Sequence, residues 1–141
     1  MTATDSSGTA GRGRVLVVDD DAALAEMLTI VLRQEGFDSR VCPVGNRALA
    51  DFREYRPDVV LLDLDTPGVE DVEQWVTALE AMTTVVLVCP RDVDEARLVA
   101  LEASGALLVL VKPLPSEWLM HALHHAIAES RGSRGPRPVA A

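Results

Sequence analysis

Two aspartates, Asp63 and Asp65, stand one residue apart, directly after the apolar run 59–62 and just before Pro67 and Gly68. A carboxylate that follows a buried strand often binds a metal ion or handles a phosphoryl group. Two kinds of chemistry use a pair with this spacing. Asp63 is either the nucleophile of a phosphohydrolase or the acceptor of a phosphoryl group that serves as a signal.

Other charged residues follow other apolar runs. Three consecutive aspartates, 19–21, come after the run 15–18, and Lys112 comes after the run 106–111. Packed carboxylates repel one another unless a cation lies among them, and a hard divalent ion such as Mg²⁺ prefers oxygen ligands. If the ends of these runs meet in space, the metal ion and the Lys112 ammonium would surround Asp63 and stabilise a phosphoryl group there.

Short apolar runs alternate with amphipathic segments, and this alternation predicts the elements that position the charged residues. The runs rich in β-branched residues predict strands at 15–19, 38–42, 58–63, 84–89 and 106–111. The other segments have helical spacing and predict helices at 22–36, 46–55, 71–82, 93–104 and 116–130. In the segment 22–36, the side chains expected to face the core are Leu24, Met27, Leu28 and Val31. In the segment 46–55, they are Ala48, Leu49 and Phe52.

Strands that alternate with helices predict parallel pairing, right-handed crossovers and helices on both faces of the sheet. The expected fold is therefore a doubly wound α/β domain over residues 14–130, with disordered tails at 1–13 and 131–141. In such a fold the site lies outside the carboxyl ends of the strands, where the strand order reverses. The charged residues that follow the strands are thus expected to converge.

The composition limits the classes of function. The chain of 141 residues is long enough for one domain, and its formal net charge is −9. An acidic surface argues against nucleic acid or an anionic membrane as the main partner, because both would repel it. We recognise no secretory leader and no membrane-spanning run, so a cytoplasmic protein is expected. Cys42 and Cys89 lack the spacing of a zinc site, and two strands are expected to separate them.

Three motifs occupy the strand ends in order: "VLVVDDDAALAEML" at 15–28, "RPDVVLLDLDTPG" at 56–68 and "VKPL" at 111–114. Together they resemble the receiver domain of two-component response regulators, especially receivers of the OmpR class, over roughly residues 14–130. The resemblance implies a flavodoxin-like (CheY-like) sheet of five parallel strands in the order 2-1-3-4-5.

The same resemblance implies a role for each site residue. Asp63 is the expected phosphoacceptor. Lys112 is the expected phosphate-sensing lysine, and its peptide bond to the following proline is often cis in the family. Asp19 and Asp20 form the expected acidic pair of a Mg²⁺ site that also includes Asp63. Asp20 and the backbone carbonyl of Asp65 are expected to contact the metal directly.

The order of the motifs separates this interpretation from a phosphohydrolase. Haloacid dehalogenase phosphatases also use an Asp-x-Asp pair, but they carry it on their first strand, and their lysine and second acidic pair come later. Here the acidic run 19–21 precedes Asp63. The receiver interpretation is therefore favoured, and the chain is expected to be a phosphoacceptor rather than an enzyme, with at most slow self-dephosphorylation.

Two switch positions depart from the receiver pattern. The family normally has Thr or Ser at the end of the fourth strand, where this chain has Cys89, and a thiol is a weak hydrogen-bond donor. The fifth strand normally carries a Tyr or Phe that turns inward on activation, where this chain has Val109. The acceptor chemistry is thus intact while the usual switch is altered. A pseudo-receiver, which binds partners without control by phosphorylation, stays open as an alternative.

The expected function is a single-domain response regulator that takes a phosphoryl group from a histidine kinase or phosphotransfer protein onto Asp63. Its output would be contact with an unknown downstream protein, without direct binding to DNA or membrane. A homodimer through the edge of the fifth strand and the last helix is a further expectation. Leu107 and Leu108 begin that strand, where related receivers tend to have acids, and Trp118 lies in that helix.

Overall fold

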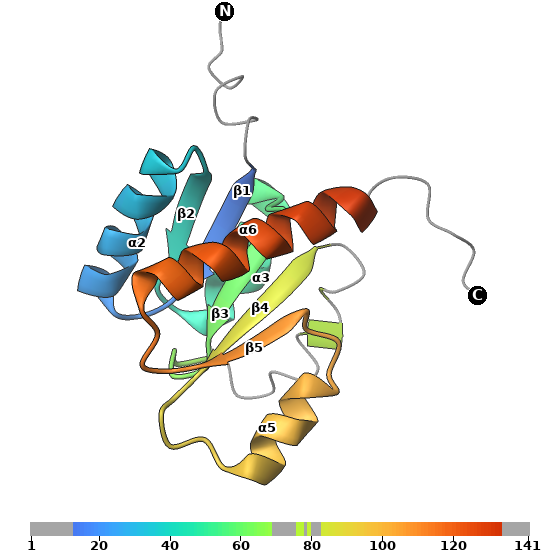
Figure 1. Cartoon of the computed structure of the whole chain (residues 1–141). Helices are drawn as coiled ribbons and strands as arrows, with labels where there is room; N and C mark the ends of the chain where they lie inside the picture. Colours follow the sequence, from blue (N-terminus) through green and yellow to red (C-terminus); the bar gives the residue numbers. More distant parts are fainter. Residues whose placement is uncertain (1–12, 69–75, 78, 80–82, 134–141) are drawn as a thin grey trace, which may run out of the picture.

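The fold is a single parallel sheet with helices on both faces. The computed structural model describes residues 13–68, 76, 77, 79 and 83–133. Five strands pair in the order β2-β1-β3-β4-β5 (Figure 1). All four pairings are parallel. The doubly wound α/β fold and the strand order expected from the sequence are therefore confirmed. The predicted tails lie largely outside the described residues.

The strands are short, and the central ones are almost entirely apolar. Their bounds are β1 (Arg14–Val18), β2 (Asp38–Cys42), β3 (Val59–Asp63), β4 (Thr84–Cys89) and β5 (Leu108–Val111). β3 is buried throughout because helices cover both faces of the sheet there. The edge strands β2 and β5 are mostly half-buried. β5 begins two residues later than the strand predicted over 106–111.

The helices agree with the predicted segments, with shifted ends. Their bounds are α2 (Ala22–Gln34), α3 (Ala48–Tyr55), α5 (Glu95–Glu102) and α6 (Ser116–Ser133), and a 3₁₀ turn covers Gly45–Arg47. Residues 76, 77 and 79 are helical, and the rest of the segment predicted as a helix over 71–82 lies outside the described residues. Because α6 continues to Ser133, residues 131–133 are helical and do not belong to a disordered tail as predicted.

The core has one layer on each face of the sheet, since side chains alternate along a strand. On one face, Val17 and Leu61 pack with α2 and α6, and α6 crosses the front of the sheet in Figure 1. On the other face, Leu16 and Leu62 pack with Phe52 of α3 and with α5. The sheet thus separates two apolar clusters, and its carboxyl edge remains free for polar groups.

Two expected core positions were wrong. Met27 of α2 is 48% exposed, because the buried stripe of this helix runs through Ala25, Leu28 and Leu32. Leu49 of α3 is 36% exposed for a similar reason, since only Ala48 and Phe52 of that helix are buried.

The start of α2 is fixed by Asp21. Its side-chain carboxylate accepts a hydrogen bond from the N–H of Leu24 at 3.1 Å. This bond satisfies one of the free donors of the first helical turn and places the helix directly after the acidic run. Among the described residues, no helix is long and apolar enough to cross a membrane.

Candidate functional site

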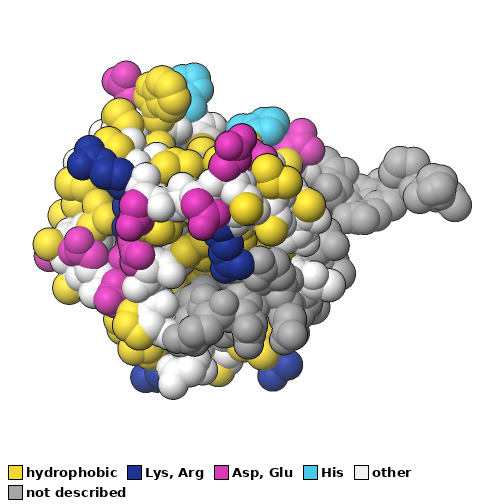
Figure 2. Space-filling view, turned by 90° about the horizontal axis from the view of Figure 1, so that it is seen from below, with side chains coloured by type: hydrophobic (Ala, Val, Ile, Leu, Met, Phe, Trp, Pro, Cys, Tyr) yellow, Lys and Arg dark blue, Asp and Glu magenta, His cyan; other side chains and the backbone are white. Residues whose placement is uncertain are grey.

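The carboxyl ends of β1, β3 and β5 bring the predicted site residues to one edge of the sheet. Asp19 follows β1, Asp63 is the last residue of β3, and Lys112 follows β5. The N–H of Lys112 donates a hydrogen bond to the carbonyl of Cys89 at 3.0 Å, which ties the end of β5 to the end of β4. Figure 2 views the molecule toward this edge, where acidic and hydrophobic side chains are interspersed.

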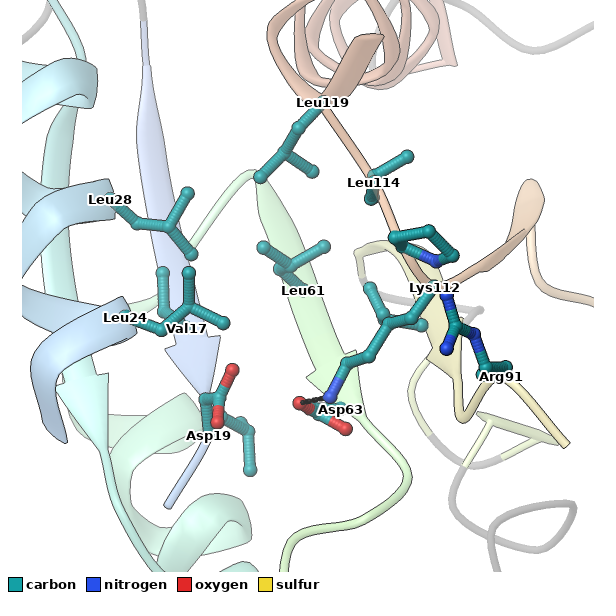
Figure 3. A pocket seen from close by; sticks show the side chains of 13 residues that line it. Val17, Asp19, Leu24, Leu28, Leu61, Asp63, Arg91, Lys112, Leu114 and Leu119 are labelled. Atoms are coloured by element: carbon teal, nitrogen blue, oxygen red, sulfur yellow. Dashed lines mark hydrogen bonds and ion pairs between the residues drawn. The ribbon is translucent and has the colours of Figure 1, made fainter. Parts of the chain in front are cut away.

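Asp63 and Lys112 form a direct ion pair. The Nζ of Lys112 lies 2.7 Å from Oδ2 of Asp63, whose side chain is 5% exposed (Figure 3). The other oxygen, Oδ1, accepts a hydrogen bond from the backbone N–H of Asp65 at 2.9 Å. Burial alone would lower the pKa of Lys112, but the hydrogen bond and charge of Asp63 raise it overall. Lys112 therefore stays an ammonium ion, and it balances the buried carboxylate.

Asp19 is a second buried carboxylate on the other side of Asp63 from Lys112. It is 5% exposed, and its Oδ1 accepts a hydrogen bond from the N–H of Asp21 at 2.9 Å. Burial raises the pKa of Asp19 to about 6; the bond from Asp21 lowers it, and the nearby charge of Asp63 raises it further. Without a cation, the fold thus disfavours the ionised form of Asp19.

The carboxylates Asp19 and Asp63 fit a Mg²⁺ site in their chemistry. Both are buried, and they repel each other, so a cation between them would relieve an electrostatic cost. Within the described part of the chain, no group of three or more His, Cys, Asp or Glu side chains is arranged to hold a metal ion. Mg²⁺ commonly binds through one or two carboxylates and keeps several waters, so two suffice. Asp20 is exposed, and its expected contact stays a prediction.

The peptide bond between Lys112 and Pro113 is cis, as the resemblance implied.

The loop after β3 is held in place by Thr66, which the sequence reasoning missed. Its hydroxyl donates to the carbonyl of Val18 at 3.4 Å, and its N–H donates to the carbonyl of Asp63 at 3.1 Å. These bonds connect the loop to the ends of β1 and β3. The only signal for this role in the sequence is a small hydroxyl residue within a turn, which is not specific.

Gly68 permits a second contact of the same loop. Its φ is +92°, and a Cβ there would lie 2.7 Å from the backbone nitrogen of Asn46. The N–H of Gly45 donates to the carbonyl of Pro67 at 2.7 Å in the same place. The loop therefore packs against the segment before α3 without room for a side chain, and this packing fixes the backbone around Asp65.

The two altered positions of the receiver pattern lie inside the domain. Cys89 is fully buried at the end of β4 and is a free thiol. Burial raises its pKa, so the thiol is uncharged at neutral pH. Val109 of β5 is half-buried and packs against the apolar cluster on the α5 face. Neither side chain provides a strong hydrogen-bond donor near Asp63.

Arg91 is a further basic residue beside the site that the sequence reasoning did not select. It follows β4 and lines the same hollow as Asp63 and Lys112 (Figure 3). The signal for it was available, because Arg91 comes two residues after the end of a strand at the same edge of the sheet. Arg91 was missed because none of the three receiver motifs includes residue 91.

The fold and the acidic edge define a receiver domain. Residues 15–124 match the family described as the response regulator receiver domain. The chain belongs to this family. An aspartate that accepts a phosphoryl group and a Mg²⁺ ion at that aspartate are general features of its members.

The relatives place the chain among OmpR-class receivers. The DNA-binding response regulator MtrA of Mycobacterium tuberculosis is 49% identical over 111 residues, which cover 77% of this chain and 48% of that protein. The sensory transduction protein RegX3 of Mycolicibacterium smegmatis is 38% identical over 108 residues, which cover 75% and 46%. The chain therefore spans about half the length of the curated relatives it matches.

A solved structure agrees with the fold. The signal receiver domain of a LuxO repressor protein from Vibrio parahaemolyticus superposes with a TM-score of 0.75 at 26% sequence identity. The match covers 86% of this chain and 95% of that chain. The CheY-like arrangement expected from the sequence is thus shared with a known receiver.

Asp19→Asn is expected to stabilise the metal-free protein at neutral pH. Because the pKa of Asp19 is raised in the fold, stability is lost as pH rises from the ordinary carboxyl range through about 6. Removing the charge should raise the free energy of unfolding by about 1–3 kcal/mol at neutral pH in EDTA, and the gain should shrink in acid. Urea denaturation across the pH range measures this difference.

The control for this experiment is Asp20→Asn, because Asp20 is exposed. It should change the unfolding free energy of the metal-free protein by less than about 0.5 kcal/mol. An Asp19→Asn variant that is less stable than the parent at neutral pH in EDTA would contradict the electrostatic account.

Proposed function

We propose that Asp63 accepts a phosphoryl group from a histidine kinase or phosphotransfer protein, and that the chain signals through protein contacts. The observation that carries this proposal is the 2.7 Å contact between Lys112 Nζ and the buried carboxylate of Asp63. Family members interact with histidine kinases, which supports the choice of donor.

The chemistry follows from the positions of the two oxygens of Asp63. One carboxylate oxygen attacks the phosphorus, the P–N bond of a phosphohistidine breaks, and its electron pair returns to the imidazole. An acyl phosphate forms, and Lys112 is placed to bind one of the phosphoryl oxygens. The N–H of Asp65 holds the other carboxylate oxygen during the attack. A bound Mg²⁺, held by Asp19 and Asp63, would neutralise charge on the phosphoryl group.

The two alternatives from the sequence have less support. A haloacid dehalogenase phosphatase does not agree with the family match over residues 15–124. A pseudo-receiver would not need a lysine paired with the acceptor, yet Lys112 makes this contact. Family members are phosphoacceptors and not classical enzymes, so slow self-dephosphorylation is the most catalysis that we propose for this chain.

The output of the chain is a separate proposal. MtrA is named as a DNA-binding regulator, and this chain matches about half of its length. The single-domain organisation and the lack of direct DNA binding stay predictions. We propose that the chain acts in the cytoplasm, because response regulators typically do.

Asp63 should gain one phosphoryl mass when the protein is incubated with Mg²⁺ and acetyl phosphate. Asp63→Asn should abolish this gain, because an amide cannot form the acyl phosphate. Asp65→Asn is the matched control and should still be labelled, since it keeps the backbone N–H that binds Asp63. Intact-mass spectrometry measures each result. Labelling that persists in Asp63→Asn would disprove the assignment.

Phosphorylation is expected to change the structure little in the parent chain. A shift between two states needs contacts that differ between them, and Cys89 and Val109 lack the polar groups that would provide these contacts. Amide spectra with beryllofluoride should show changes near Asp63 only. The double variant Cys89→Thr with Val109→Tyr should extend the changes to α5 and β5. Large changes across α5 and β5 in the parent would show that these two positions are not needed for the switch.

The expected homodimer keeps Trp118 but not the two leucines selected in the sequence. Leu107 and Leu108 are half-buried and pack against the apolar cluster, so they provide little exposed surface. Trp118 of α6 is 66% exposed, and Val111 of β5 is 37% exposed. We propose that these two side chains form the apolar centre of a contact between copies.

Trp118→Ala should therefore shift the protein toward the monomer by about tenfold in dissociation constant, because a buried aromatic anchor contributes more than about 1 kcal/mol. Light scattering over a concentration series measures this shift. Val99→Ala is the control, since Val99 is 58% exposed on α5, away from α6. A parent that stays monomeric at high concentration would rule out the homodimer.

A further inference from the structure

A cavity of about 440 Å³ opens beside the site and extends between α2 and α6 (Figure 3). We call it the inter-helix cavity. It lies over the sheet face that α2 and α6 cover. Its apolar walls are formed chiefly by Val17, Leu24, Leu28, Leu61, Leu114 and Leu119. The volume lies within the range of roughly 300–1,000 Å³ that is usual for small-molecule sites.

The walls come from elements that face each other across the sheet. Leu24 and Leu28 extend from α2, Leu119 extends from α6, and Leu114 precedes α6, while Leu61 of β3 lies beneath (Figure 3). A space of this size would hold about 15 water molecules, but these side chains offer them few hydrogen bonds. An apolar molecule would gain free energy by displacing that water.

The polar groups of the cavity lie together at its mouth. Asp19, Asp63, Lys112 and Arg91 contribute to it. Lys112 is already bound to Asp63 at 2.7 Å and lies 3.5 Å from Asp65. Arg91 is exposed and forms no ion pair with any residue that the structure describes. Arg91 is thus the group at the mouth that can pair with an anion. The carboxylates of Asp19 and Asp63 would repel a second anionic group on the same ligand.

We propose that the inter-helix cavity binds a small molecule with an apolar body and a single anionic group, and that Arg91 pairs with this group. The apolar body lies between α2 and α6. This site is distinct in its chemistry from the acceptor, because burial of apolar surface provides its affinity. It does not depend on phosphorylation of Asp63.

Two dyes of one aromatic skeleton test the proposal on the full chain without a phosphodonor. They are 1-anilinonaphthalene-8-sulfonate, which carries a sulfonate, and N-phenyl-1-naphthylamine, which lacks it. Both should bind saturably, with one equivalent per chain, in fluorescence titrations. Leu24→Trp fills the cavity from α2 and should weaken both dyes at least about tenfold. Leu114→Trp fills it from the segment before α6 and gives the same test if the first variant does not fold.

Leu98→Trp is the matched control. Leu98 is also a half-buried helical leucine, but it packs against the cluster on the opposite face of the sheet. Both dyes should bind this variant within about twofold of the parent, since the inter-helix cavity is unchanged. Arg91→Ala should weaken the sulfonate dye about three- to fivefold and leave the neutral dye unchanged.

Absence of saturable binding by both dyes would overturn the proposal. Binding that is unaffected by both Leu24→Trp and Leu114→Trp would also overturn it, because the dyes would then lie elsewhere. Equal weakening of the two dyes by Arg91→Ala would refute the pairing with an anionic group. None of these results depends on whether Asp63 accepts phosphate.

Discussion

The carboxylate of Asp63 is buried at the end of a central strand, and a buried charge needs a partner. The partner, Lys112, comes from β5, which is separated from β3 by β4. Its ammonium must therefore extend across the end of β4 to contact Asp63 at 2.7 Å. This geometry requires parallel strands that end at one edge of the sheet. It also requires a fixed end of β5, which the bond from the Lys112 N–H to the Cys89 carbonyl provides. The loop after β3 must leave room for the lysine, and the hydrogen bonds of Asp65 and Thr66 hold that loop in place.

The two faces of the sheet are packed differently. On the face of α3 and α5, leucine, valine and phenylalanine side chains form a continuous cluster. On the face of α2 and α6, the helices pack well at the amino end of the sheet and leave a hollow of about 440 Å³ toward its carboxyl edge. Missing contacts in an apolar hollow reduce stability, since the wall side chains lose dispersion partners. The fold tolerates this loss next to the edge that holds Asp19, Asp63 and Lys112.

The sequence predicted the sheet better than the helices, for a physical reason. A strand covered on both faces must be apolar throughout, so the runs at β3 and β4 could be recognised without knowledge of their neighbours. The buried side of a helix depends on what packs against it, which is why Met27 and Leu49 were assigned incorrectly. Asp19, Asp63 and Lys112 could be placed at one edge because the strand ends converge in this fold. Arg91 could have been placed there on the same ground, since it follows the end of β4. The inter-helix cavity could not be predicted, because it depends on the separation of α2 from α6. The metal contacts of Asp20 and of the Asp65 carbonyl follow from the family resemblance alone and stay predictions.

The end of β5 is tied to β4 by a main-chain hydrogen bond from Lys112 to the carbonyl of Cys89. A carbonyl is present whatever the side chain at that position, so replacing Cys89 leaves this bond available. The position of Lys112 therefore does not depend on which side chain residue 89 carries. Substitutions at residue 89 can therefore change the polarity beside the site without displacing Lys112 from Asp63.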